Sequence, residues 1–351
     1  MVPRATLDSV PQGAAGLHLL ALQGSWRLLV QSTKDLLGSA ASLPIHDRLV
    51  ASTYNVLALT KLRMYGAALD EVRSLGDLDQ PKLIQNGQSL VPFALRYLAA
   101  ELPYRLGQSQ AGFDALYSLM HRCKKEFEQR SLAPDGSAST NHNPKGAALW
   151  LRRQEMVLYT LLTHHLQNND FGVVLLWLEQ LLQQHSEDVV VLSRVGYVLL
   201  QVGDVEGAGR AFKCASDIIN APENETNPKL PMHMLLAMAR RNHGLLLFAK
   251  KDLQGAQVEF NKALEQDPSD VVSINNYALC LMYQRDLMGA TRFLEENLQS
   301  DPVKYMNEPL ILNLCSMYDL AWAAGTENKR RLSSWLSKIA PDDFDLNCTR
   351  L

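Results

Sequence analysis

The sequence predicts an all-α solenoid of helix-turn-helix repeats, because it combines a fixed period, a fixed set of residue sizes and no strand-like alternation. Two stretches near the C-terminus repeat at a spacing of 34 residues. Each copy closes on an Asp-Pro pair, first Asp267-Pro268 and then Asp301-Pro302. Thirty-four residues is the period of the tetratricopeptide (TPR) helix pair. No segment alternates apolar and polar residues over a useful length, so the chain is not expected to form a sheet.

The recurring residues are those that a TPR helix pair needs for packing. Small residues such as Gly244 and Ala256 let two helices approach, bulky Phe260 locks them together, and a proline stops the second helix. The predicted repeat-packing residues are Gly196, Ala208, Phe212, Gly244, Ala256, Phe260, Ala263, Pro268, Ala278, Ala290, Leu294 and Pro302.

An insertion interrupts the period upstream of the clear pair. Ala208 and Ala256 take the same template position but lie 48 residues apart, which is one period plus fourteen residues. The extra residues fall in a loop at about 219–232, whose prolines cannot continue a helix. One period earlier, Val174 and Leu178 mark a degenerate copy with larger side chains.

The best internal boundary is the segment 130–146, which is rich in Gly, Ser, Asn and Pro and is predicted to be a loop or hinge. Residues 1–129 before it are predicted to form a helical region of degenerate repeats, in which Tyr65 and Ala68 have the spacing of a second TPR helix. Residues 147–322 form the predicted TPR array. Residues 323–351 are predicted to cap it, since terminal repeats are covered on one side only.

Composition argues against several classes of protein. The chain has 351 residues, of which 47% are apolar, and a formal net charge of −3, whereas nucleic-acid binders usually carry a basic excess. Its longest apolar run is too short to span a bilayer, so no membrane span is expected. The five cysteines are scattered without a C-x-x-C pair, which fits a reducing cytosol and neither disulfides nor zinc. Cys214 and Cys280 are expected to be buried.

The sequence offers no constellation for catalysis. It contains no phosphate-binding loop, dinucleotide fingerprint, nucleophile elbow or zinc-protease motif. Residues 203–209 are glycine-rich but fall at the predicted turn between two helices. Adjacent His164 and His165 would point about 100° apart on a helix, so they would not share a metal ion. We therefore expect no enzyme activity, catalytic residue, cofactor, metal or small-molecule substrate.

A basic patch near the C-terminus has two interpretations. Its members are Lys329, Arg330, Arg331 and Lys338. Cations near a helix end complement the helix dipole, which is the simpler interpretation. The alternative is a docking patch for an acidic partner or an anionic membrane surface.

One face of the predicted first helices is a candidate groove for a partner. Its positions are Met238, Arg241, Leu245, Phe248, Asn275, Leu279 and Met282. A mostly apolar stripe of this kind suits an amphipathic partner helix, unless neighbouring repeats coil tightly and bury it. A co-chaperone adaptor, the alternative function, would need a basic clamp for an acidic tail, which these positions lack.

The C-terminal region contains residues that generic TPR packing does not require. These are the stretch from Asn313-Leu314 to Tyr318-Asp319-Leu320 and the closing DFDLNCTRL. In these residues the region resembles the TPR region of subunit 12 of the trafficking protein particle (TRAPP) complex. The matching positions are Asn275, Asn276, Ala278, Cys280, Leu281, Tyr283, Asp301, Pro302, Tyr305, Glu308, Leu312, Asn313, Leu314, Met317, Tyr318, Leu320, Phe344, Asn347 and Cys348.

This resemblance implies a non-catalytic subunit of a TRAPP III-type assembly, acting with the eighth, eleventh and thirteenth subunits. That assembly is a tether and Rab-GTPase exchange factor in transport from the endoplasmic reticulum to the Golgi and in autophagy. Exchange belongs to the core subunits, so no catalytic residue carries over. The resemblance also implies a cytoplasmic protein, peripheral at ER–Golgi intermediate or Golgi membranes, with other TRAPP subunits as partners.

Overall fold

The computed structural model describes residues 11, 13–38, 43–85, 88–131, 144–221, 230–321 and 325–350. Most of the predicted hinge at 130–146 and most of the predicted insertion at 219–232 lie outside these residues. The predicted boundary at residues 322 and 323 lies outside them too. The chain divides into two compact units, and the division falls between His164 and His165. The first unit also takes in residues 341–343, and the second takes in 344–351.

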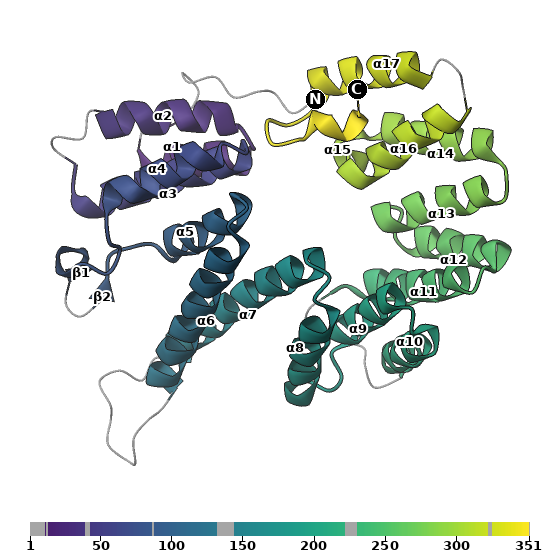
Figure 1. Cartoon of the computed structure of the whole chain (residues 1–351), viewed down its shortest axis with the longest axis horizontal. Coiled ribbons are helices and arrows are strands. Elements are labelled where there is room, and N and C mark those ends of the chain that lie inside the picture. Colours follow the sequence, from purple (N-terminus) through teal and green to yellow (C-terminus); the bar gives the residue numbers. More distant parts are fainter. Residues whose placement is uncertain are drawn as a thin grey trace. The chain divides into compact units, whose positions relative to one another are not determined.

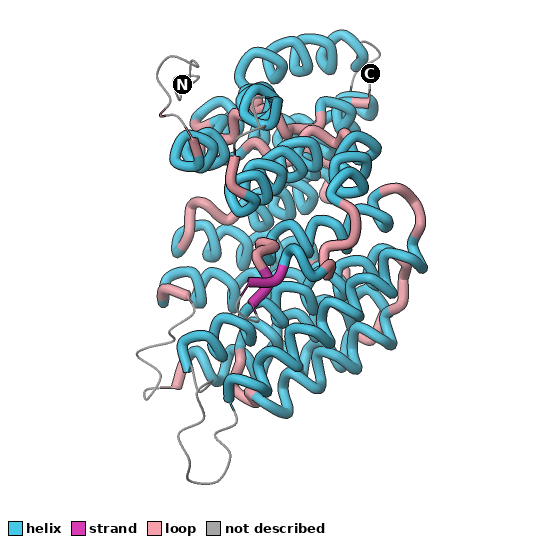
Figure 2. Tube along the Cα trace, turned by 90° about the vertical axis from the view of Figure 1, so that its left-hand side faces the viewer, coloured by secondary structure: helices cyan, strands magenta, loops and turns pink. Residues whose placement is uncertain are grey.

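The first unit consists of helices with one short hairpin (Figures 1 and 2). Its elements are α1 (Ala14–Leu22), α2 (Trp26–Gly38), α3 (Ile45–Lys61), α4 (Tyr65–Leu75), the 3₁₀ turn Pro81–Leu83, β1 (Ile84–Gln85), β2 (Gln88–Ser89), α5 (Phe93–Arg105), α6 (Ser109–Ser131) and most of α7 (Pro144–Gln167). The strands pair antiparallel, with Ile84 opposite Ser89. Each strand has two residues, so the hairpin decorates an otherwise helical unit.

The second unit is a run of helices stacked in chain order (Figure 1). Its elements are α8 (Phe171–Gln184), α9 (Val189–Val202), α10 (Val205–Ile219), α11 (Met232–Ala249), α12 (Leu253–Gln266), α13 (Val271–Tyr283), α14 (Leu287–Ser300), α15 (Pro302–Tyr305), α16 (Glu308–Ala321), α17 (Gly325–Ile339) and the 3₁₀ turn Leu346–Thr349. Every extensive contact among the described residues of this unit joins elements that are close neighbours in sequence. The predicted all-α solenoid is therefore confirmed.

In every helix pair whose connecting turn the structure describes, one turn residue lies in the left-handed region of backbone space. In the second unit, Gly203 has φ +92°, Lys251 +66° and Arg285 +71°. The corresponding turns before α2, α4, α6 and α8 use Gly24, Arg63, Gly107 and Asn169. Such a residue directs the chain out of one helix so that the next can pack back against it. The first unit shares this turn, so it too is built from helix pairs.

The next helix is then started by an aspartate in the three regular pairs. Asp204, Asp252 and Asp286 each accept a hydrogen bond from the backbone N–H three residues on, at 2.8–2.9 Å. This satisfies one of the free N–H groups of the helix start. The donor is a glycine each time, and a β-carbon at Gly289 would lie 2.6 Å from the Asp286 Cγ. Glycine therefore makes room for the capping carboxylate.

The left-handed lysine gives a prediction for stability. Lys251→Gly should raise the free energy of unfolding by about 0.5–1 kcal/mol, because glycine adopts positive φ without steric cost. The control is Lys250→Gly, one residue earlier, where φ is −77° and glycine has no advantage. Urea unfolding midpoints would compare the two variants. If Lys251→Gly is as destabilised as Lys250→Gly, the left-handed assignment of this turn is wrong.

Candidate protein-interaction surfaces

Two of the predicted small residues face a bulky partner across a helix pair of the second unit. A β-carbon at Gly244 of α11 would lie 2.7 Å from the Phe260 ring of α12, and Gly196 faces Phe212 in the same way. The small and bulky residues at the other positions are buried: Ala208, Ala256, Ala263, Ala278, Ala290 and Leu294. Pro268 and Pro302 follow the ends of α12 and α14. The helices thus approach closely where these residues lie.

The seven residues of the predicted partner groove are largely engaged with neighbouring helices. Met238 is 6% exposed and packs with residues of α9 and α10. Leu245 and Phe248 pack beside Phe260, while Leu279 and Met282 pack against the C-terminal core. Asn313 Nδ2 of α16 donates a hydrogen bond to Asn275 Oδ1 of α13 at 2.8 Å. Most of the apolar stripe therefore contributes to packing between repeats.

Arg241, the cation of the predicted groove, lies at the centre of a polar network that joins three repeats. Its guanidinium donates to Asp270 Oδ1 at 2.9 Å and to the Tyr197 hydroxyl at 3.4 Å. That hydroxyl donates to Asn242 Oδ1 at 2.5 Å, and Asn242 Nδ2 donates to Ser193 Oγ at 2.8 Å. The network therefore runs from α9 through α11 to the start of α13.

The positive charge of Arg241 is stabilised by its neighbours in this network. Burial alone would lower the pKa of Arg241, but Tyr197 and Asp270 outweigh it, so its pKa lies above its usual value. Asp270 also caps α13, since its Oδ1 accepts from the Val272 N–H at 3.2 Å. One carboxylate thus serves both the helix start and the neighbouring repeat.

A smaller part of the first helices stays open to solvent. Val272 and Tyr283 of α13 are 50% and 60% exposed. They lie eleven residues apart, close to three helical turns, so both point from the same side of the helix. The Tyr283 ring meets Phe248 of α11 edge-on, with 5.7 Å between ring centroids. We call Phe248, Val272 and Tyr283 the first-helix face.

The C-terminal residues that carry the family resemblance cover the last helix pair. Phe344, Leu346 and Cys348 pack against the core formed by α13 to α17. The backbone N–H of Asp345 donates to Glu308 Oε1 at 3.2 Å. Burial raises the pKa of the Cys348 thiol to about 11. The specific tail sequence therefore has a packing role at this end of the array.

The basic residues of α17 are mostly paired. Lys329 is buried and bonds to Asp319 of α16. Arg330 and Arg331 lie 3.9 and 3.3 Å from the carboxylate of Glu327, one turn earlier. Lys338 is exposed in the last turn of the helix. Only Lys338 is therefore placed to complement the dipole at the helix end, while the other three lie in the first half of α17 and pair with carboxylates.

The adjacent histidines have different surroundings. His164 stacks on Tyr104, with 3.7 Å between ring centroids, whereas His165 lies 3.0 Å from Asp170. In the described part of the chain, no three His, Cys, Asp or Glu side chains gather as metal ligands would. No helix among the described residues is long and apolar enough to cross a membrane.

One expectation about the cysteines was wrong. Cys280 is buried, which raises the pKa of its thiol to about 12, but Cys214 is exposed. The buried face of α10 contains Ala208, Phe212 and Ala215, and the position of Cys214 lies off that face.

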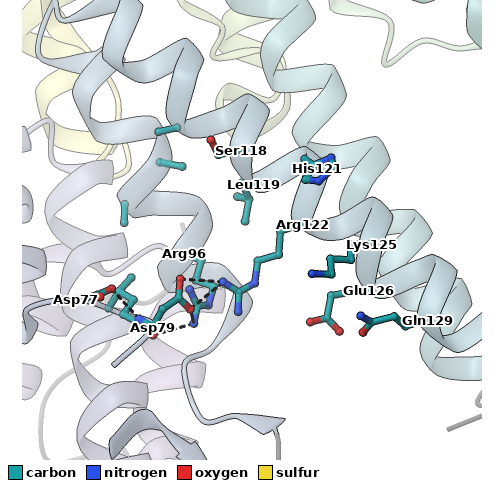
Figure 3. Close-up of a pocket in the computed structure, with 14 residues that line it drawn as sticks. Asp77, Asp79, Arg96, Ser118, Leu119, His121, Arg122, Lys125, Glu126 and Gln129 are labelled. Carbon is teal, nitrogen blue, oxygen red and sulfur yellow. Dashed lines mark hydrogen bonds and ion pairs between the residues drawn. The ribbon is translucent and has the colours of Figure 1, made fainter. Parts of the chain in front are cut away.

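The first unit contains a polar cleft that the sequence does not reveal (Figure 3). Asp79, in the connection between α4 and α5, lies 2.8 Å from both Arg96 of α5 and Arg122 of α6. Burial would raise the pKa of Asp79, but hydrogen bonds from Arg122 and Arg96 outweigh it and hold the pKa below its usual value. These three residues are 17 or more positions apart and fit no short motif, so no sequence pattern points to them.

Comparison with known proteins finds similarity along nearly the whole chain. No protein-family model matches it. Trafficking protein particle complex subunit 12 of Mus musculus is 28% identical over 98% of this chain and 45% of its own length. The Homo sapiens protein of the same name is 28% identical over 98% of this chain and 49% of its length. The chain therefore spans about half the length of the curated relatives it matches.

Two solved structures have some likeness to the chain at low sequence identity. A tetratricopeptide repeat protein from Parabacteroides merdae is 13% identical, with a TM-score of 0.44, and the match covers 93% of this chain and 99% of that one. A chain of the APC/C hetero-tetramer Cut9-Hcn1 is 15% identical, with a TM-score of 0.40, over 89% of this chain and 50% of that one.

The 34-residue period, the paired helices and their left-handed turns define a helical repeat protein of the TPR class. Within that class, the chain is similar to subunit 12 of the TRAPP complex. The similarity extends over 98% of the chain, well beyond the C-terminal residues that suggested it.

Proposed function

We propose that the protein is a non-catalytic TPR scaffold subunit of a TRAPP III-type vesicle-tethering complex. In this role it binds other TRAPP subunits and acts in ER-to-Golgi transport and autophagy. It would be cytoplasmic and peripheral at ER–Golgi intermediate or Golgi membranes. The observation that carries the proposal is the similarity to subunit 12 along 98% of the chain. The complex and its partners are taken from that family.

The physical argument for a scaffold is the surface that a solenoid offers. Helix pairs that contact mainly their neighbours expose a large area for their length. We propose that the partners are proteins rather than nucleic acids or small molecules, in keeping with the net charge of −3. The adaptor alternative is weakened because Arg241, the one cation at the groove positions, is bonded to Asp270.

The identity of the complex is tested by gentle purification of the tagged protein from its native cells, with the companions identified by mass spectrometry. Stoichiometric recovery of TRAPP subunits is the expected result. Recovery of chaperones alone would favour the adaptor alternative and would contradict the proposal.

We further propose that the first-helix face contributes to partner binding. Val272→Asp with Tyr283→Asp should reduce recovery of the partner subunits about tenfold or more, because two charges would enter an apolar contact. Both side chains are at least half exposed, so the fold should tolerate the change. These sites test the surface more cleanly than the half-buried Phe248 and Met282.

The matched control is Val258→Asp on α12, where the valine is 52% exposed but lies on a second helix. It should leave partner recovery unchanged. Equal recovery with both variants, at unchanged far-ultraviolet circular dichroism, would place the partner on another surface.

A further inference from the structure

The polar cleft of the first unit has a composition that suits a ligand. It is an open cleft of about 740 Å³ between the α4–α5 connection, α5 and α6. Ala99, Ala100 and Ala115 contribute small apolar side chains to its lining. One wall is a stripe along α6, formed by Ser118, His121, Arg122, Lys125 and Gln129. Ser118, Arg122, Lys125 and Gln129 recur every three or four residues, and His121 comes three residues after Ser118, so they share one side of the helix.

The carboxylates of the cleft already have partners. Asp79 is held between Arg96 and Arg122 (Figure 3). Asp77 Oδ1 accepts from the backbone N–H of Asp79 at 2.9 Å. Glu126 is bonded to Arg130 on the next turn of α6.

The donors on the α6 wall are not matched in the same way. Lys125 and His121 are exposed, and neither has a hydrogen-bonding or ionic partner among the residues that the structure describes. Ser118 and Gln129 likewise have no such partner within the described ranges. Arg122 shares the Asp79 carboxylate with Arg96, and the charge of Asp77 also acts on Arg96. Lys125 is therefore the lysine or arginine of the cleft lining that has no carboxylate partner among the described residues.

Arg96 keeps this arrangement rigid. Its side chain is 9% exposed, and its Nη2 also donates to the Leu78 carbonyl at 2.8 Å and to Ser89 Oγ at 3.0 Å. Burial, followed by the charge of Arg122, lowers the pKa of Arg96 from its usual value. The α4–α5 connection, the hairpin and α5 are thus fastened together beside the α6 stripe.

We propose that this cleft binds a short, extended acidic segment of a partner protein. Arg122 and Gln129 are seven residues apart, about 10 Å along the helix, which matches about three residues of extended chain. Carboxylates of the segment would accept from Lys125, Arg122 and His121, while small side chains would lie over the alanines. This inference rests on the proposed scaffold role on one point only, namely that a partner protein supplies the acidic segment.

The test uses a fluorescein-labelled octapeptide of alternating glutamate and alanine, titrated with the full chain and followed by fluorescence anisotropy. We expect saturable binding that weakens with added salt. Lys125→Glu should lower the affinity about tenfold or more, since it converts one charge-assisted contact into a repulsion. The matched control is Lys124→Glu, an exposed lysine next to it that does not line the cleft. It should change the affinity less than about threefold.

Absence of saturable binding, or an equal loss in both lysine variants, would overturn the proposal. So would binding to phosphatidylserine vesicles that depends on Lys125 while the peptide fails to bind, because the cleft would then recognise a membrane. The peptide assay does not depend on which complex the protein joins. A failed peptide titration therefore removes the acidic cleft alone, and a failed recovery of TRAPP subunits removes the proposed complex alone.

Discussion

Replacing Asp270 with alanine should destabilise the second unit by about 3 kcal/mol or more. The change removes the cap of α13. It also removes the carboxylate partner of Arg241, whose side chain is only 21% exposed. A charge left without its partner in such surroundings costs far more than a lost surface contact. Urea unfolding followed by far-ultraviolet circular dichroism would measure the effect as a shift of the midpoint.

Asp286 provides the matched control. It caps α14 through the Gly289 N–H at 2.9 Å, and no ion pair of Asp286 is seen in the described structure. Asp286→Ala should therefore cost only about 1 kcal/mol. Combining Asp270→Ala with Arg241→Met should recover most of the difference, because the buried charge is then gone. Equal costs for the two aspartates would mean that the Arg241 ion pair contributes nothing beyond capping.

Ala290→Trp should cost about 3 kcal/mol or more, because a large ring cannot enter a close-packed interface without displacing helices. Ala290 is fully buried beside Leu294 and Ala278. Ala256→Trp should behave alike, since Ala256 is fully buried at the equivalent position of the preceding pair. The shift of the urea unfolding midpoint would again measure the loss of stability.

Met288→Trp, two residues earlier on the same helix, is the control. Met288 is exposed, so a ring there should change stability by less than about 0.5 kcal/mol. Unchanged unfolding of the two buried variants would mean that the repeat register is misassigned.

The sequence was sufficient to predict the helix pairs because their packing is local and periodic. Gly244 and Phe260 are sixteen residues apart, and the next pair repeats them as Ala278 and Leu294. A second local signal would have located the turns independently. Asp-x-x-Gly occurs at Asp204, Asp252 and Asp286, and it marks the start of the second helix in each regular pair.

The interaction surfaces were harder to predict because they depend on contacts between distant residues. Arg241 was expected to face a partner, but it bonds to Asp270, which lies 29 residues away. A side chain at this helix position can face either the groove or the start of the next repeat. The 34-residue period is the same in both cases, so it does not distinguish them. The Asp79 cleft lies where a hairpin interrupts the repeats, so no template covers it.

Because helices of the second unit contact mainly their neighbours in sequence, their position in the array determines how readily they open. In the second unit, a central pair such as α11 and α12 is held from both sides, whereas α16 and α17 have a helix pair on one side and the short C-terminal turn on the other. Such an array unfolds locally from its ends inward. Amide protons of central pairs should therefore exchange with solvent more slowly than those at the margin. Opening one margin of the array should therefore cost less free energy than opening its middle.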